Sequence, residues 1–282
     1  MTLITRTLVE LRAKDPLNKK RLLKVVDACN TFSNKTRIKY IFDGQQYSTY
    51  SSNRDILQAW DQMEKQYGSE GPAFILTTDK DHALFAFGPR EDPYGFYNED
   101  AIEFSFIVDK PLLKPDGYFS FVELKEFFIA TINSYEAYCA YIHDNQLEEL
   151  IVSGFTAENM KAQLPRELWE HIPTPELAAH IPADIIARIS KLITPEKFDR
   201  LSIPEAIYWF NYWNEFQVEN LGEEKVKTAP CEVVEKQKNG GYILIVQKEN
   251  FRADNIDQME KMAKVYDHFN LYEIQDRFRF DK

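Results

Sequence analysis

The feature that most constrains the fold is a run of bulky side chains, Ile207-Tyr-Trp-Phe-Asn-Tyr-Trp-Asn214. Successive side chains of a β-strand point to opposite faces, so a strand here would carry aromatic rings on both faces. Because both faces then need cover, the run predicts a central strand within the core. A second interpretation is that its C-terminal end, with Trp213 and Glu215, reaches the surface as part of a recognition face.

The periodicity of the rest of the chain predicts helices and strands in mixed order. Helical spacing ends near residue 32, starts again after Ser52-Asn53, and follows a capping box at Ser120 and Glu123. Asn239-Gly240 lies between two apolar runs, as in a β-hairpin. The predicted strands are 3–11, 36–42, 73–78, 83–88, 101–108 and 137–143, and 271–280 fits a strand or a short helix.

These patterns predict an α+β fold with largely antiparallel sheet or sheets flanked by helices, in one body or two lobes. No regular βαβ repeat occurs, which argues against a doubly wound parallel sheet. We expect an N-terminal α+β lobe over residues 1–144 and a helical, proline-punctuated connector over 145–200. A C-terminal α+β part, residues 201–282, would complete the sheet.

The charge and the cysteines bear on partners and location. Acidic side chains number 45 against 34 basic ones, a formal charge of −11, which argues against direct nucleic-acid binding and suits a basic partner or simple solubility. Cys29, Cys139 and Cys231 sit in apolar contexts and are predicted to be buried thiols in a reducing compartment. With no signal-peptide pattern and no membrane-spanning run, we expect a cytoplasmic protein.

No catalytic, cofactor or metal motif stands out. There is no HExxH, no paired CxxC, no glycine-rich phosphate loop and no G-x-S-x-G elbow. Glu123-Leu-Lys125 imitates a metal-dependent nuclease motif, but Glu123 is assigned to helix capping. We therefore expect a binding protein without catalytic residues, metal or cofactor. Two alternatives stay open: a metal-dependent hydrolase whose site combines scattered acids with a histidine such as His143, and a structural or adaptor module of a secretion system.

The C-terminal third resembles a known family. The run from Pro204 to Asn214, then Gly222, then Lys238-Asn-Gly-Gly-Tyr-Ile-Leu-Ile-Val246 and an acidic amphipathic helix are similar to bacterial immunity proteins. That family is paired with restriction-endonuclease-like toxin domains of polymorphic-toxin and type VI secretion systems. The segment from Glu123 to Ile142 fits the family's middle region, and the likeness covers residues 100–275. It implies a non-catalytic cytoplasmic protein that binds and blocks one cognate, DNA-cleaving toxin.

A toxin that grips DNA phosphates is basic around its active site, so we expect acidic patches with aromatic anchors to contact it. The first candidate is the loop 91–100. The second is Trp213 with Glu215, Glu219, Glu223 and Glu224. The predicted toxin-binding residues are Glu91, Asp92, Tyr94, Phe96, Tyr97, Glu99, Asp100, Trp213 and Glu215. The alternative for the loop is that its aromatic rings pack back over the sheet while its acids are solvated. For the second candidate the alternative is an ordinary solvated helix face.

Overall fold

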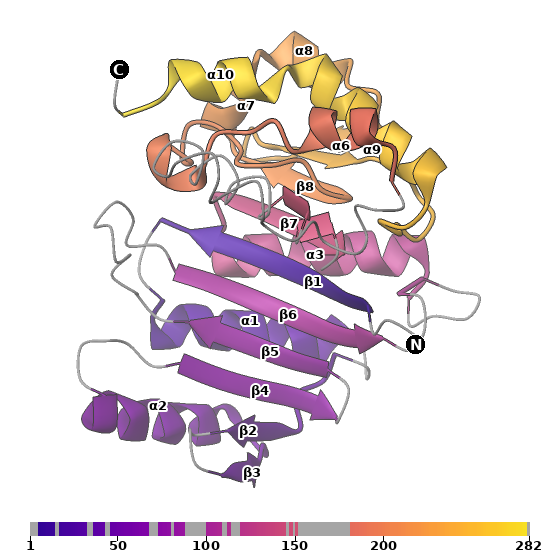
Figure 1. Ribbon diagram of the computed structural model, residues 1–282. Coiled ribbons are helices and arrows are strands. Elements are labelled where there is room, and N and C mark those ends of the chain that lie inside the picture. The colour runs from indigo at the N-terminus through magenta and orange to yellow at the C-terminus, as the bar shows by residue number, and fades with distance from the viewer. Residues whose placement is uncertain are drawn as a thin grey trace, which may run out of the picture. The chain divides into compact units, whose positions relative to one another are not determined.

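The chain forms two compact units, Met1–Tyr141 and Ile142–Lys282, which are described separately. The structure, a computed structural model (Figure 1), describes residues 5–14, 17–32, 36–42, 46–67, 73–79, 82–87, 100–108, 112–113, 119–144, 147–148, 150–151 and 181–280. Within these ranges, the chain has no helix with both the length and the apolar character that crossing a membrane requires.

The first unit is built on a sheet with the strand order β3-β2-β4-β5-β6-β1-β7. The pairs β1–β6, β5–β6, β4–β5, β2–β4 and β2–β3 are all antiparallel. The strands are β1 (Thr5–Ala13), β2 (Tyr40–Phe42), β3 (Tyr47–Thr49), β4 (Ala73–Asp79), β5 (His82–Phe87), β6 (Asp100–Val108) and β7 (Cys139–Asp144). From Ile142 onward, β7 belongs to the second unit.

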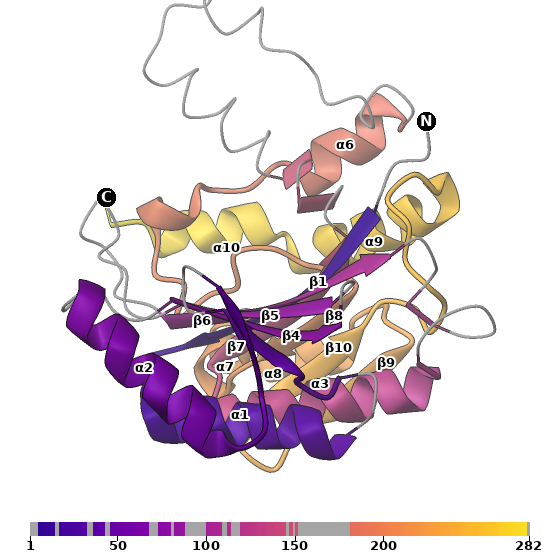
Figure 2. The ribbon, with the colours of Figure 1, turned by 90° about the horizontal axis from the view of Figure 1, so that it is seen from below.

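Three helices of the first unit lie on one face of this sheet (Figure 2): α1 (Lys19–Phe32), α2 (Asn53–Tyr67) and α3 (Phe121–Tyr135). α1 packs against α3, and the rings of Phe32 and Phe127 lie 5.3 Å apart. The predicted capping box is confirmed, because Ser120 Oγ accepts from Glu123 N and Glu123 Oε2 accepts from Ser120 N. Glu123 is thus part of a helix start, which satisfies amides that no helical carbonyl reaches.

In the second unit, β10 lies between β8 and β9 and is antiparallel to both. Gly240 has a φ of +87°, as the predicted hairpin turn requires. The elements are α6 (Ala183–Ile189), η3 (Pro195–Lys197), β8 (Phe210–Trp213), α7 (Glu215–Leu221), α8 (Glu223–Lys227), β9 (Val233–Lys236), β10 (Tyr242–Ile245), α9 (Ile256–Phe269) and α10 (Leu271–Arg277). Arg188 fastens α6 to α9, because its guanidinium bonds both Glu260 and Asp267.

Buried side chains bond to the backbone of residues 190–209, the segment between α6 and β8, which is irregular apart from η3. The hydroxyl of Tyr266 accepts from Ile207 N at 2.9 Å and donates to Ile207 O at 3.0 Å. The amide of Gln275 accepts from Ile193 N and donates to Pro204 O, each at 2.9 Å. At these positions the segment pairs with no strand among the described residues, and these polar side chains supply the hydrogen bonds instead. The buried backbone groups named here are therefore satisfied without regular secondary structure.

The central strand is shorter than expected. Both faces of the run are covered, as expected, but only Phe210–Trp213 forms a strand. Asn211 explains the difference: its amide oxygen accepts from Tyr208 N at 2.8 Å and its amide nitrogen donates to Tyr208 O at 2.7 Å. A side chain that occupies both backbone groups of Tyr208 takes them away from any ladder.

The α+β class, with largely antiparallel sheets and flanking helices, is confirmed. The expected strand 36–42 is reduced to β2, and β3 was not expected. The C-terminal end forms the helix α10 up to Arg277, and Cys231 is half-buried rather than buried. Much of the expected connector 145–200 lies outside the described residues, so the three predicted domain ranges stay a prediction.

Candidate partner-binding site

The two predicted patches differ in how much of them the structure describes. Glu91, Asp92, Tyr94, Phe96, Tyr97 and Glu99 lie outside the described residues. Asp100 is the first residue of β6, where it is paired with Ala13 of β1. The patch that lies within the described residues is therefore the second one, around α7.

α7 is short, and its ends are held by side chains. Asn214 Oδ1 accepts from Gln217 N at 2.8 Å, and Gln217 Oε1 accepts from Asn214 N at 3.2 Å, which completes a capping box. The same Gln217 donates to Arg200 O at 2.8 Å. Gly222, with a φ of +91°, ends the helix. A helix this short would not persist alone, so these contacts fix its position and its rotation.

Trp213, which the second interpretation of the aromatic run placed on this surface, is part of the core, as the first interpretation predicted. Its side chain is 0% exposed and meets Phe269 edge to face, with ring centroids 5.1 Å apart. Neighbouring Tyr212 is also buried. The reason is β8 itself, whose strand residues are buried on both faces up to its last residue. Of the predicted pair, only Glu215 offers its side chain to solvent.

The aromatic side chain on this surface is Phe216, which is 68% exposed and which the sequence analysis missed. The sequence does contain a pattern that predicts this exposure. The capping box sets the start of the helix, and Val218 and Leu221 form its buried side. Glu215 and Glu219 are four residues apart and therefore neighbours on the helix surface, and Phe216 is three residues from Glu219. All three side chains fall outside the buried stripe and are oriented to solvent.

The β9–β10 turn lies against the start of α7. A Cβ at Gly240 would lie 2.9 Å from Glu215 Cδ, so the carboxylate arm of Glu215 rests on the turn. Asn239 is exposed, and its Nδ2 donates to Tyr212 Oη at 2.7 Å, which ties the turn to β8. Glu215, Phe216, Glu219, Asn239 and Gly240 together form what we call the Phe216 face.

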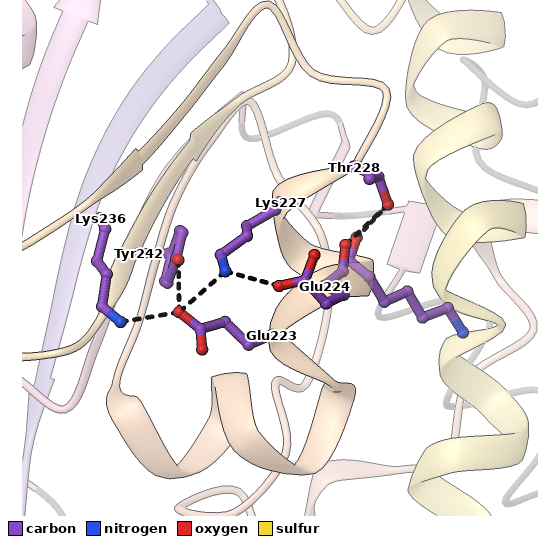
Figure 3. Close-up of polar contacts among 7 residues, drawn as sticks. Glu223, Glu224, Lys227, Thr228, Lys236 and Tyr242 are labelled. Carbon is purple, nitrogen blue, oxygen red and sulfur yellow. Dashed lines mark hydrogen bonds and ion pairs between the residues drawn. The ribbon is translucent and has the colours of Figure 1, made fainter.

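The remaining acids of the predicted patch are engaged with lysines (Figure 3). Glu223 Oε1 accepts from Lys236 Nζ and from Tyr242 Oη, each at 2.8 Å, and lies 3.7 Å from Lys227 Nζ. Hydrogen bonds from Lys236 and Tyr242 lower the pKa of Glu223 to about 2. Lys227 Nζ also donates to Glu224 at 2.7 Å. These carboxylates are therefore already neutralised by their neighbours.

Glu215 and Glu219 differ from this cluster. Among the residues that the structure describes, neither has a basic group within ion-pair distance. One exposed cation, Lys238, stands on the adjacent turn. The Phe216 face thus combines an exposed ring with two carboxylates that form no ion pair within the described part of the chain.

His143, the histidine of the alternative hydrolase hypothesis, is completely buried. Its ring packs against Tyr208 with centroids 4.7 Å apart, and its Nδ1 lies 3.7 Å from Glu148 Oε2. Among the residues that the structure describes, no group of three or more His, Cys, Asp or Glu is placed to hold a metal ion.

Comparison with known proteins shows a likeness in fold. Neither a protein-family model nor a curated protein matches the sequence. Among solved structures, the Pseudomonas aeruginosa T6SS protein PA0821 is similar in fold, with a TM-score of 0.52 and 14% sequence identity. The likeness covers 95% of this chain and 73% of that one. At this identity it shows a common fold that extends over nearly the whole chain.

Proposed function

We propose that this protein is an immunity protein that binds a cognate, DNA-cleaving secreted toxin and neutralises it. The observation that carries the proposal is the likeness in fold, over 95% of the chain, to the T6SS protein PA0821 of Pseudomonas aeruginosa. The pattern from Pro204 to Val246 supports the same class. In this proposal the chain performs no catalysis and needs no cofactor, and it acts in the cytoplasm, where the toxin would meet DNA.

The acidic balance of the chain fits such a partner. A DNA-cleaving enzyme presents cationic side chains to phosphates, and a protein with a formal charge of −11 attracts that surface over long range. An exposed aromatic ring among carboxylates can supply the apolar anchor that charge alone does not. The Phe216 face has this composition.

The test is co-expression with the product of the neighbouring gene. We expect that product to arrest growth alone, to lose its toxicity when this chain is present, and to be pulled down with it. DNA cleavage by the purified toxin should stop on addition of a stoichiometric amount of this protein. A neighbour that neither binds nor poisons the cell would contradict the proposal, and a screen for metal-dependent activity of this chain would then be the next experiment.

The loop 91–100 can be tested in the same assay. If it contacts the toxin, reversing the charges of Asp92 and Glu99 weakens binding while the circular dichroism spectrum stays unchanged. Unchanged affinity in this double variant would remove the loop from the interface and leave the function itself standing.

A further inference from the structure

The Phe216 face has the properties of a preformed binding surface. Phe216 exposes 68% of its area on a helix whose start and end are both fixed by hydrogen bonds or by glycine. Asn220 Nδ2 adds a bond to Ser202 O at 3.1 Å, and Asn239 holds the neighbouring turn. A partner that docks here has little backbone to order, so most of the contact energy remains for affinity.

The charges on this surface indicate the chemistry of its partner. Glu215 and Glu219 bracket the ring along the helix, and among the described residues neither forms an ion pair with a basic group. An arginine guanidinium is planar, stacks on aromatic rings and donates two parallel hydrogen bonds to a carboxylate. A lysine ammonium could meet the carboxylates but lacks the flat surface that suits the ring.

We propose that the Phe216 face is the surface through which this protein holds its toxin, and that it receives arginine side chains of the toxin's DNA-binding surface. The inference rests on the proposed function and adds to it the place of contact and the partner chemistry. Guanidinium groups that would grip phosphates are paired instead with Glu215 and Glu219, while Phe216 covers their planar faces. The toxin surface is thereby withdrawn from DNA.

The chain offers matched controls for both parts of this surface. Phe280 is 52% exposed and lies outside the Phe216 face, so Phe280→Ala removes a similar exposed ring at a different place. Glu249 is exposed and, like Glu219, has no ion-pair partner in the described part of the chain. Glu249→Lys therefore changes the net charge as much as Glu219→Lys does, at a different place.

The experiment measures the affinity of each variant for the purified product of the neighbouring gene, by titration calorimetry at low and high salt. We expect Phe216→Ala to weaken binding by about ten- to a hundredfold, as loss of an interface anchor does. Glu219→Lys should weaken binding by about tenfold or more and flatten its salt dependence. The controls Phe280→Ala and Glu249→Lys should stay within about twofold of the unsubstituted protein.

A third variant tests the arginine chemistry. Phe216→Leu keeps an apolar side chain and removes the π face, so it should bind more weakly than Phe216→Tyr, which retains the ring. Equal affinities for these two would overturn the assignment of guanidinium stacking. All substituted side chains are exposed, and circular dichroism checks that each variant is folded.

The outcomes separate this inference from the function on which it rests. If the unsubstituted protein binds and blocks the toxin while Phe216→Ala and Glu219→Lys bind as tightly, the Phe216 face is not the contact and the immunity function stands. If the unsubstituted protein does not bind the toxin, the function fails and the inference with it. If sedimentation shows a dimer of this chain that Phe216→Ala converts to monomer, the face belongs to a second copy and the inference is overturned.

Discussion

The hydroxyl of Tyr266 is a single buried atom on which the irregular segment before β8 depends. It accepts from Ile207 N and donates to Ile207 O, and burial raises the pKa of the phenol. Tyr266→Phe removes the oxygen and leaves a buried N–H and a buried C=O without that partner. Each orphaned group costs about 1–3 kcal/mol, and partial relaxation lowers the sum, so we expect a loss of about 2–4 kcal/mol in the free energy of unfolding.

Guanidinium denaturation followed by tryptophan fluorescence measures this loss, because Trp209 and Trp213 both lie in the same unit as Tyr266. Tyr272→Phe is the matched control. The Tyr272 hydroxyl makes no hydrogen bond to the residues described, and its ring would keep the contact with Lys191 Nζ at 5.0 Å. The control should change stability by about 0.5 kcal/mol or less. A loss below about 1 kcal/mol in Tyr266→Phe would refute the role given to the hydroxyl.

Three further substitutions test other parts of the second unit. Trp209→Ala deletes a core side chain and should cost about 3–5 kcal/mol in the free energy of unfolding, so a fully stable variant would contradict its burial. Gly241→Ala would place a Cβ 2.6 Å from Trp213 O, a backbone atom that cannot easily move, and should lower the melting temperature; an unchanged value would argue against this close approach. Glu223→Gln should destabilise the protein at neutral pH. The folded pKa of Glu223, about 2, lies below its usual 4.5, so its contribution is present above the usual value and is lost as the pH falls towards the folded one. Urea midpoints of the two proteins should therefore converge in acid, and a difference that does not depend on pH would contradict the pairing with Lys236.

The elements that were predicted correctly are those whose sequence signals lie within the element or next to it. Ser120 and Glu123 start a helix by bonding each other's backbone, and Asn239-Gly240 turns the chain with Gly240 at a positive φ that glycine adopts readily. Such signals lie within a few residues and can be read without knowing the fold. The N-terminal part of the aromatic run is different, since the side chain of Asn211, a residue of β8, bonds back to the backbone of Tyr208 and keeps it out of the strand.

The candidate site was predicted in part for a related reason. Glu215 is exposed as expected, whereas Trp213 is core and Phe216 takes the surface position. Both are aromatic and lie three residues apart, so composition cannot separate them. The difference comes from the change from strand to helix at Asn214. Every residue of β8 is buried, whereas α7 buries only one stripe of its surface, and Phe216 lies outside that stripe.

The side chains that hold the segment before β8 also bear on the order in which the second unit can form during synthesis. Ile207 bonds to a residue 59 positions later, and Ile193 and Pro204 bond to one that is 82 and 71 positions later. Until α9 and α10 have emerged from the ribosome, the segment cannot form these hydrogen bonds. During synthesis, the segment before β8 therefore lacks its hydrogen-bond partners, Tyr266 and Gln275. The native fold of this unit can form only after its last two helices have been synthesised.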